Sequence, residues 1–165
     1  MNLSVISSYS TAMLQIRLHE GSRDTLQHLF AEADDSEIEI AAYRDLGEVL
    51  VAVRDGAIVG HLQIVPSDAP ATLEVKSLAV HEQCRSRGIG AALIEAACVY
   101  GRERGAETLI VATAAASIPA LQFYQRQGFR ILRVIRDFYS RERGYRPLEL
   151  NGITLRDEVI LDLAL

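Results

Sequence analysis

The segment best suited to chemistry lies at residues 78–91, where a predicted strand ends and a predicted helix begins. It contains Arg85 and Arg87, followed by Gly88 and Gly90. The first N–H groups of a helix have no intrahelical acceptor, and the helix dipole places partial positive charge there. Glycine lets the backbone approach a ligand closely, and the arginine guanidinium matches the geometry of phosphate. The segment therefore predicts an anion cradle, for which a pyrophosphate is the natural ligand.

Two common phosphate-binding motifs fit this segment poorly. A dinucleotide-binding fingerprint requires a third glycine at the position where this chain has Leu93. A P-loop requires Gly-Lys followed by Ser or Thr, and the sequence contains no such tripeptide. The sequence therefore disfavours a dinucleotide or a nucleoside triphosphate as the ligand.

The elements that must position the cradle follow from the periodicity of apolar residues. Strands are predicted over residues 13–18, 49–53, 58–65, 72–80, 108–112, 129–135 and 159–165. Helices are predicted over residues 24–33, with Asp24 as the N-cap, and over 89–104 and 118–127; residues 36–45 are compatible with a further helix. Asp55-Gly56 predicts a tight hairpin turn. The pattern is that of an α+β protein with an antiparallel first half.

Length and composition bound the class of protein. The chain has 165 residues, 49% hydrophobic and 24% charged, which predicts one folded domain over residues 1–165. Because the sequence has no run of about 18 apolar residues and no recognisable signal segment, we expect a cytoplasmic protein that does not enter a membrane. Its two cysteines are too few for a disulfide framework or a four-ligand zinc site, and no metal is expected.

The charge distribution limits the classes of binding partner that we expect. A net charge of −5 argues against binding to nucleic acid, whose affinity comes mainly from basic residues on phosphate. Residues 1–80 carry a net charge of −7 and residues 81–165 a net charge of +2. That asymmetry suits a cationic substrate and an anionic cofactor, although chance explains it equally well.

Two motifs in order resemble the GNAT superfamily of N-acetyltransferases. Arg85-x-x-Gly88-x-Gly90, after a strand ending in Leu78-Ala79-Val80, is similar to the family's acetyl-CoA signature, Gln/Arg-x-x-Gly-x-Gly/Ala. Residues 117–129 are similar to its Asn-x-x-Ala-x-x-Leu/Phe-Tyr-x-x-x-Gly-Phe helix. The resemblance implies a GNAT-like fold, with a mixed, splayed central sheet of about seven strands flanked by helices. It also implies transfer of an acetyl group from acetyl-CoA to a primary amine in a ternary complex.

The resemblance assigns residues to acetyl-CoA. In the family, the strand before the loop parts from its neighbour, and the pantetheine arm enters the gap. The implied contacts are Leu78, Ala79, Val80, Arg85, Ser86, Arg87, Gly88, Ile89, Gly90, Ala91, Ser117, Ala120 and Tyr124. Ser117 stands where the family often has asparagine, so it either contacts the pantetheine arm or only caps the following helix.

The catalytic acid follows from the same resemblance. Tyr124 matches the tyrosine that protonates the departing CoA thiolate. A phenol suits this step because its pKa near 10 is only slightly above that of a thiol. The alternative is a tyrosine that merely packs in the core beside Phe123.

The catalytic base is less sharply indicated. Glu74 lies on the strand before the loop, where family members often carry a glutamate base. Strict alternation places it on one face with Lys76, Leu78 and Val80. A salt bridge between Glu74 and Lys76 is the alternative. His81 and His61 are weaker candidates, because an unperturbed imidazole titrates near neutral pH but a lone histidine is more often structural.

The acceptor is implied by an acidic run at residues 32–39, a region that forms one wall of the acceptor site in the family. Carboxylates neutralise and attract ammonium groups, so we expect a small cationic molecule, although such runs are often only solvated surface. The predicted acceptor contacts are Asp34, Asp35, Glu37, Tyr43, Phe138 and Tyr139. An aminoglycoside-type antibiotic is the favoured acceptor, which would make the protein a resistance factor. The alternatives are a protein or peptide N-acetyltransferase and a non-catalytic CoA-binding module. The apolar alternation over residues 159–165 is compatible with a homodimer.

Overall fold

A computed structural model describes residues 13–165; the first twelve residues, including the start of the chain from which no signal segment was inferred, lie outside the described range. The described chain forms a seven-stranded sheet in the order β1-β2-β3-β4-β5-β9-β6. Its strands are β1 Leu14–Leu18, β2 Glu48–Arg54, β3 Ala57–Pro66, β4 Thr72–Val80, β5 Thr108–Ala114, β6 Arg130–Ile135 and β9 Glu158–Ala164. All neighbouring strands are antiparallel except β4 and β5, which are parallel. The predicted mixed α+β sheet is therefore confirmed.

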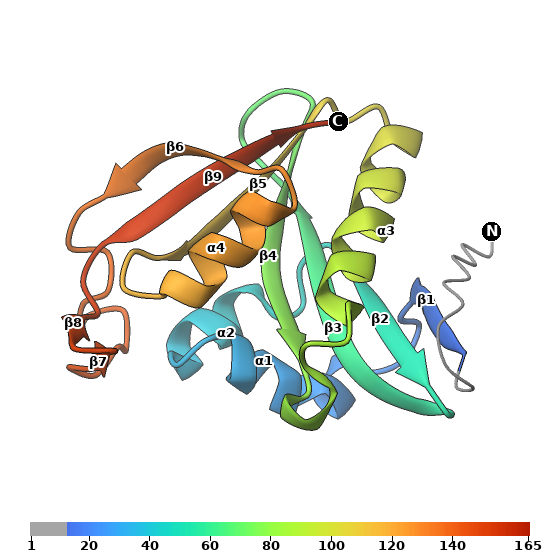
Figure 1. The fold of residues 1–165 in the computed structure, drawn as a ribbon, viewed down its shortest axis with the longest axis horizontal. Helices are drawn as coiled ribbons and strands as arrows, with labels where there is room; N and C mark the ends of the chain where they lie inside the picture. Colours follow the sequence, from blue (N-terminus) through green and yellow to red (C-terminus); the bar gives the residue numbers. More distant parts are fainter. Residues whose placement is uncertain (1–12) are drawn as a thin grey trace.

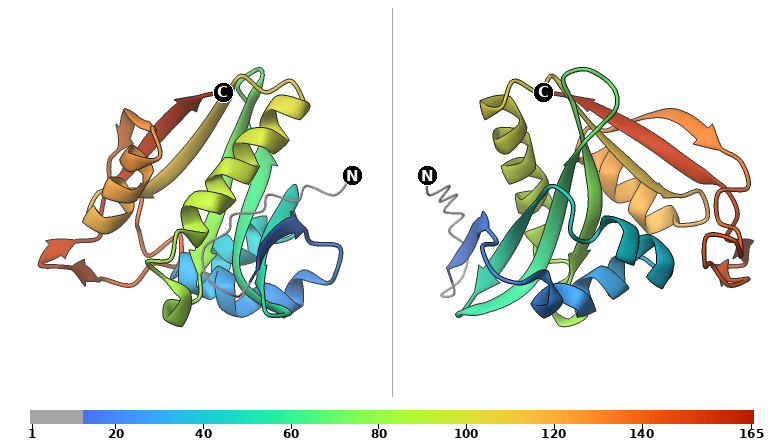
Figure 2. Two further views of the ribbon diagram at one scale, coloured as in Figure 1. Left: turned by 45° about the vertical axis from the view of Figure 1, so that its right-hand side comes forward. Right: turned by 180° about the vertical axis from the view of Figure 1, so that it is seen from behind.

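Four α-helices cover this sheet within residues 13–165: α1 Gln27–Ala33, α2 Glu37–Tyr43, α3 Ile89–Glu103 and α4 Ile118–Arg126. Helices α3 and α4 lie on one face, and α1 and α2 lie on the other (Figures 1 and 2). None of the helices in this part of the chain is long and apolar enough to cross a membrane.

The start of the first helical segment differs from the prediction. A 3₁₀ turn, Arg23–Leu26, precedes α1, and Ser22 is its N-cap, accepting a hydrogen bond from the backbone N–H of Asp24 at 3.2 Å. Asp24 lies inside the turn, so the prediction of Asp24 as the N-cap is wrong by two residues. Serine and aspartate are both favoured caps, and the tighter turn moves the first helical residue toward the N-terminus.

Apolar packing on both faces holds the sheet. Leu93 of α3 and Leu62 of β3 are fully buried between α3 and the sheet, and burial of such a side chain stabilises the fold by about 1.5–3 kcal/mol. Val159 and Leu161 of β9 belong to the same core cluster, and Leu163 packs against it. The apolar face of the last strand is thus used inside the molecule, and it does not offer the dimer surface that its alternation suggested.

The sheet divides between β4 and β5. Thr72–Val75 of β4 pairs with Thr108–Val111 of β5, and beyond these residues the two strands are no longer paired. Figure 1 shows β5, β9 and β6 leaning away from β4, with α4 beside the opening. The predicted splay is confirmed, and it leaves the second half of β4 without a neighbour on that side.

A β-bulge at Lys76 coincides with the point of division. Gln63 of β3 is in register with Ser77, but the next residue of β3 is in register with Val75, so Lys76 is the extra residue. A bulge shifts the phase of side chains and increases the local twist. As a result Val75 and Leu78 both pack into the core under α3. The prediction that Glu74, Lys76 and Leu78 share one face is therefore wrong.

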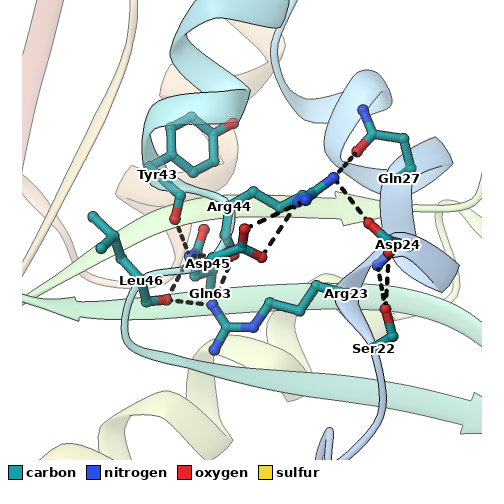
Figure 3. A network of polar contacts seen from close by, with 9 residues as sticks. All are labelled: Ser22, Arg23, Asp24, Gln27, Tyr43, Arg44, Asp45, Leu46 and Gln63. Atoms are coloured by element: carbon teal, nitrogen blue, oxygen red, sulfur yellow. Dashed lines mark hydrogen bonds and ion pairs between the residues drawn. The ribbon is translucent and has the colours of Figure 1, made fainter.

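Polar contacts fix the carboxyl end of α2 over the sheet (Figure 3). The side-chain amide of Gln63 donates to the carbonyls of Tyr43 and Leu46, both at 2.7 Å. The Arg23 guanidinium donates to the carbonyl of Arg44 at 2.7 Å and also to that of Leu46. These donors satisfy carbonyl groups that a helix end leaves unpaired, and they hold the Tyr43 ring in place.

Residues 136–157, here named the strap, connect β6 to β9 and carry the short hairpin β7 Glu149–Leu150 and β8 Ile153–Thr154. The strap is attached to α2, because the Arg143 guanidinium pairs with Glu39 at 2.9 Å and the Ser36 hydroxyl donates to the carbonyl of Arg143. Figure 1 shows the hairpin at the lower left, next to the start of β9. The strap therefore places the C-terminal part of the chain next to the turn between α1 and α2.

Candidate active site

The predicted cradle is the N-terminus of α3. Gly88 is its N-cap, with φ of 78°, and within the described residues no side chain caps it. A β-carbon added at position 88 would meet no protein atom within 4 Å, so the space above the first turn is open. The first N–H groups of α3 lack intrahelical acceptors and are available to a ligand. This geometry fits a pyrophosphate group.

The two arginines of the cradle behave differently. The Arg85 Nε donates to the carbonyl of Val80 at 3.0 Å, and its guanidinium pairs with Glu32 of α1 at 2.9 Å. Arg85 therefore lies at the cradle already engaged with a carboxylate. Arg87 is exposed and is not among the residues that line the cavity, so its contact with acetyl-CoA stays a prediction. The residues on either side of Arg87, Ser86 and Gly88, both have positive φ, of 60° and 78°, so the chain turns at this point.

A groove of about 840 Å³ extends from the cradle into the opening between β4 and β5. Its walls are the second half of β4, the first turn of α3, residues 111–113 of β5 and one face of α4. All predicted acetyl-CoA contacts except Arg87 line it: Leu78, Ala79, Val80, Arg85, Ser86, Gly88, Ile89, Gly90, Ala91, Ser117, Ala120 and Tyr124. Residues that the local motifs did not assign, including Lys76, Thr113 and Arg126, also line the groove.

Helix α4 presents one face to the groove. Ser117, Ala120 and Tyr124 are spaced by three and four residues, which places them along a single stripe of the helix. Ser117 is at the N-cap position, but its hydroxyl makes no capping hydrogen bond. Its side chain is thus free to meet a ligand, which favours the predicted contact over a purely structural cap. A β-carbon at Gly90 would lie 3.1 Å from the Phe123 ring, so glycine there lets α4 approach α3.

Tyr124 lies in the wall of the groove. Its ring packs edge-on against Phe123 and Phe129, with centroids 5.1 and 5.7 Å apart. Burial raises the pKa of the Tyr124 phenol well above its usual value of 10, because the anion would lose its hydration. The phenol therefore keeps its proton at neutral pH, as a proton donor requires.

A second cavity, of about 240 Å³, lies on the other side of the strand opening and is here named the acceptor pocket. Five residues line both cavities, so the groove and the pocket meet there: Ala33, Lys76, Ala112, Thr113 and Ser117. The junction lies where β4 and β5 have just parted, next to the bulge. A thioester that follows the groove and an amine that enters the pocket would meet at this junction.

The acceptor pocket is acidic and aromatic. Five of the predicted acceptor contacts line it: Asp34, Asp35, Tyr43, Phe138 and Tyr139. Glu37, also predicted, does not line it; it is exposed on the first turn of α2. Helix geometry explains the difference, because residues two apart face different directions and Glu39 faces the pocket instead.

Three acidic or tyrosine residues line the pocket without having been predicted from the sequence: Glu39, Tyr145 and Glu158. Glu39 was within the acidic run, and helical spacing could have selected it. Tyr145 and Glu158 lie far along the chain and reach the pocket only because the strap folds back over α2 and β5. No local sequence signal marks them.

Lys76, the only lysine of the chain, lies among these carboxylates. Its ammonium pairs with Glu74 at 3.3 Å and lies 5.5 Å from the centroid of the Tyr43 ring. The structure therefore contains the salt bridge that was the alternative interpretation of Glu74. Both residues line the pocket, so Glu74 also remains within reach of an acceptor.

Burial raises the pKa values of one carboxyl group and two phenol groups in the pocket. Burial raises the pKa of Glu158 to about 7; nearby Lys76 lowers it and nearby Glu74 raises it further. Burial, and then the charge of Asp34, raises the pKa values of Tyr43 and Tyr145 above their usual range. The tyrosines are therefore neutral hydroxyl groups, and Glu158 changes its charge near neutral pH.

The two histidines considered as bases lie outside the acceptor pocket. His61 is fully buried, its Nε2 is 2.8 Å from the Ser77 hydroxyl, and burial lowers its pKa to about 3. His81 precedes a 3₁₀ turn, Glu82–Cys84, beyond the end of β4. Within residues 13–165 no group of three or more His, Cys, Asp or Glu side chains is placed to hold a metal ion.

Comparison with known proteins places this geometry in a family. Residues 12–129 match the acetyltransferase (GNAT) family. An uncharacterised N-acetyltransferase of Bacillus subtilis (strain 168), YvbK, is 34% identical over 152 residues, covering 92% of this chain and 97% of that protein. The chain therefore belongs to the GNAT family, and it is an acetyl-CoA-dependent N-acetyltransferase.

Two solved structures have the same fold. An acetyltransferase of Bacillus subtilis in complex with CoA is 33% identical, with a TM-score of 0.83, and covers 92% of this chain and 99% of its own. An IAA acetyltransferase from Bacillus cereus ATCC 14579 is 30% identical, with the same TM-score and the same two coverages. The open cradle and the parted strands described above fit the CoA carrier that the first of these relatives binds.

Proposed function

We propose that this enzyme acetylates a primary amine of a small molecule that carries more than one positive charge. The observation that supports this most directly is the junction between the CoA groove and an acidic pocket. Carboxylates of Asp34, Asp35, Glu39 and Glu74 surround a cavity that opens onto the groove. A second ammonium group on the acceptor would be held by these carboxylates while the first reacts at the junction.

The proposed reaction is direct attack in a ternary complex. The pyrophosphate is held at Gly88 and the following N–H groups, and the pantetheine arm lies along the unpaired edge of β4 at Leu78 and Val80. Acetyl-CoA supplies an activated thioester. The neutral amine attacks its carbonyl carbon, the carbon–sulfur bond breaks, and Tyr124 gives a proton to the sulfur. A carboxylate of the pocket accepts the proton that the ammonium must first lose, and Glu74 is the base that the family resemblance suggests.

The size of the pocket limits the acceptor. A cavity of about 240 Å³ is smaller than the 300–1,000 Å³ that usually encloses a drug-sized ligand. A short polyamine fits inside, whereas an aminoglycoside-type antibiotic would insert one aminated ring and leave the remainder outside. Both present an ammonium group to the junction and further ammonium groups to the carboxylates. Resistance to such an antibiotic would follow only from the second case.

The test is a thiol-release assay with acetyl-CoA and a panel of amines. The panel contains polyamines, aminoglycosides, matched monoamines, peptides and IAA, the molecule for which the Bacillus cereus relative is named. We expect kcat/KM for diamines and polyamines to exceed that for monoamines of the same length. Preference for peptides would instead support a protein N-acetyltransferase.

A paired substitution tests the role of the carboxylates. Asp35→Asn removes a charge from the pocket lining, and Glu37→Gln removes a charge next to it, outside the lining. We expect Asp35→Asn to raise KM for a diamine by roughly three- to tenfold, with a smaller effect on a monoamine, because one ion pair contributes about 1 kcal/mol. Glu37→Gln should leave both KM values within twofold. Equal responses of the two acceptors, or of the two variants, would contradict recognition by charge.

A further inference from the structure

We propose that Glu158 is the general base that takes the proton from the acceptor ammonium. This inference rests on the proposed amine acetylation, but it concerns a different strand from the glutamate that the family resemblance suggests. Glu158 is the first residue of β9 and is in register with Ala114 of β5. Cross-strand partners point to the same face of a sheet. Ala114 packs with Tyr145 and Leu155 of the strap, so this face is the acceptor side.

The position of Glu158 relative to the junction supports a catalytic role. Ala112 and Thr113, which line both cavities, are the two residues before Ala114 on β5. Glu158 lines the acceptor pocket but not the CoA groove. Its carboxylate is therefore on the amine side of the junction, and CoA does not displace it. A base must occupy this side, because the proton leaves the nitrogen before the nitrogen attacks.

Glu74 is less suited to the role. It is in register with Ile110, in the part of the sheet where β4 and β5 are still paired. Its carboxylate is paired with the Lys76 ammonium at 3.3 Å, so it is already engaged with a cation. Glu158, in contrast, forms no ion pair within 4.0 Å among residues 13–165, and only 8% of its surface is exposed. Glu74 is better placed to bind a distal ammonium than to remove a proton.

The groups around Glu158 come from every element that faces it. Lys76 and Glu74 face it from β4, Glu39 from α2, and Arg143 and Tyr139 from the strap. Burial outweighs the two cations and raises the pKa of Glu158 to about 7. A carboxyl group with this pKa accepts a proton from an ammonium and returns it to water within one turnover, which an ordinary carboxylate does less readily.

The acceptor ammonium loses two protons during the reaction. The ammonium gives one proton to Glu158, and the neutral nitrogen forms a bond to the acetyl carbon. The attacking nitrogen then loses its second proton, the carbon–sulfur bond breaks, and Tyr124 protonates the sulfur. The proton from the nitrogen replaces the one that Tyr124 gave, and Glu158 releases its proton to water. The net products are the amide, CoA thiol and one proton.

The experiment compares Glu158→Gln with Glu74→Gln over pH 5.5–9, using the best amine from the panel. We expect wild-type kcat to rise with pH through about 7 as Glu158 loses its proton. Glu158→Gln should lower kcat by roughly 100-fold or more and abolish this rise, because general base catalysis contributes about that factor. Glu74→Gln should keep the rise near pH 7 and mainly increase KM.

Thermal unfolding provides a second measurement that separates loss of the base from loss of the fold. A carboxyl group whose pKa is raised in the folded state stabilises the protein least at high pH, so stability falls as pH rises from about 4.5 through about 7. Glu158→Gln removes this fall. We expect the Tm of Glu158→Gln to equal or exceed that of the wild type at pH 8.5 and to lose that advantage below pH 4.5.

Two results would overturn the assignment of the base. One is a Glu158→Gln enzyme that retains wild-type kcat and the rise near pH 7, and the other is loss of that rise in Glu74→Gln. Failure of the wild-type enzyme to acetylate any amine of the panel is a different result, since it would contradict the proposed function before either variant is compared.

Discussion

The CoA groove and the acceptor pocket are built in different ways. Backbone features form the groove: the left-handed Gly88, the uncapped first turn of α3 and the unpaired edge of β4. Half of its lining residues come from one continuous segment, residues 75–91; the others come from α4 and its caps, a short part of β5 and the end of α1. The acceptor pocket is formed mainly by side chains from four separate regions: the α1–α2 turn with α2 itself, β4, β5, and the strap with β9.

The difference indicates how the protein divides its tasks. A backbone cradle holds a ligand that never changes, since every turnover uses the same carrier. A pocket of side chains on a turn and a strap can change its acceptor through substitutions that leave the sheet intact. We therefore expect substitutions at the groove to affect CoA binding or the chemical step for every acceptor, and substitutions at the pocket to affect acceptors unequally.

The largest expected effect is a loss of kcat when the proton donor in the wall of the CoA groove is removed. Tyr124→Phe removes a hydroxyl group from the groove wall without changing the packing of its ring against Phe123 and Phe129. We expect kcat to fall by roughly 100-fold for every acceptor, with CoA affinity within twofold of the wild type, because only the proton donor is lost. Steady-state kinetics and calorimetry with CoA measure the two quantities.

Tyr145→Phe is the matched control, because it removes a phenol hydroxyl from the acceptor pocket instead. We expect it to change KM unequally among acceptors, with a much smaller effect on kcat. If Tyr124→Phe and Tyr145→Phe changed kcat equally, the division between groove and pocket would not describe catalysis.

Much of the groove could be predicted because its determinants are local. The spacing of Arg85, Gly88 and Gly90 after an apolar strand marks a helix N-terminus that binds anions. The three- and four-residue spacing of Ser117, Ala120 and Tyr124 marks one face of a helix. Each of these patterns spans at most eight residues, and the structure brings all six side chains or backbones to one cavity.

The errors have equally specific causes. Strict alternation failed on β4 because the bulge at Lys76 shifts the phase, and the residue types around it do not reveal an inserted residue. Glu158 and Tyr145 were missed because the strap brings them to α2 through long-range contacts such as the Arg143–Glu39 ion pair. The exposed position of Arg87 could not be predicted either, because the arginine type suits phosphate but the direction of the side chain depends on the turn at Ser86.

The second-largest expected effect tests whether backbone N–H groups at Gly88 form the phosphate site. Gly88→Ala and Gly105→Ala are matched, since both glycines have positive φ, at opposite ends of α3, and a β-carbon at either meets no protein atom within 4 Å. Both should destabilise the fold by roughly 1–2 kcal/mol, the cost of a left-handed alanine. Only Gly88→Ala should weaken CoA binding, by about tenfold or more, because its methyl group occupies the space next to the phosphate-binding N–H groups.

Calorimetry with CoA and thermal unfolding measure these two effects separately. Equal CoA affinity in the two variants would show that the phosphate does not lie above Gly88. It would also remove the main support for a groove defined by its backbone.

The smallest expected effect concerns the ion pair by which Glu32 of α1 holds Arg85 of the cradle. The Arg85 guanidinium must leave Glu32 before it can face a phosphate, and that pair is partly exposed. An exposed pair contributes at most about 1 kcal/mol, so Glu32→Gln should tighten CoA binding by up to about fivefold.

Glu82→Gln is the control. Glu82 lies in the same loop as Arg85, and its carboxylate forms no ion pair within residues 13–165. If both variants tightened binding equally, the cause would be net charge. If Glu32→Gln weakened binding, the pair would instead hold Arg85 in its productive position, and the groove would depend on a side chain of α1 as well as on its own backbone.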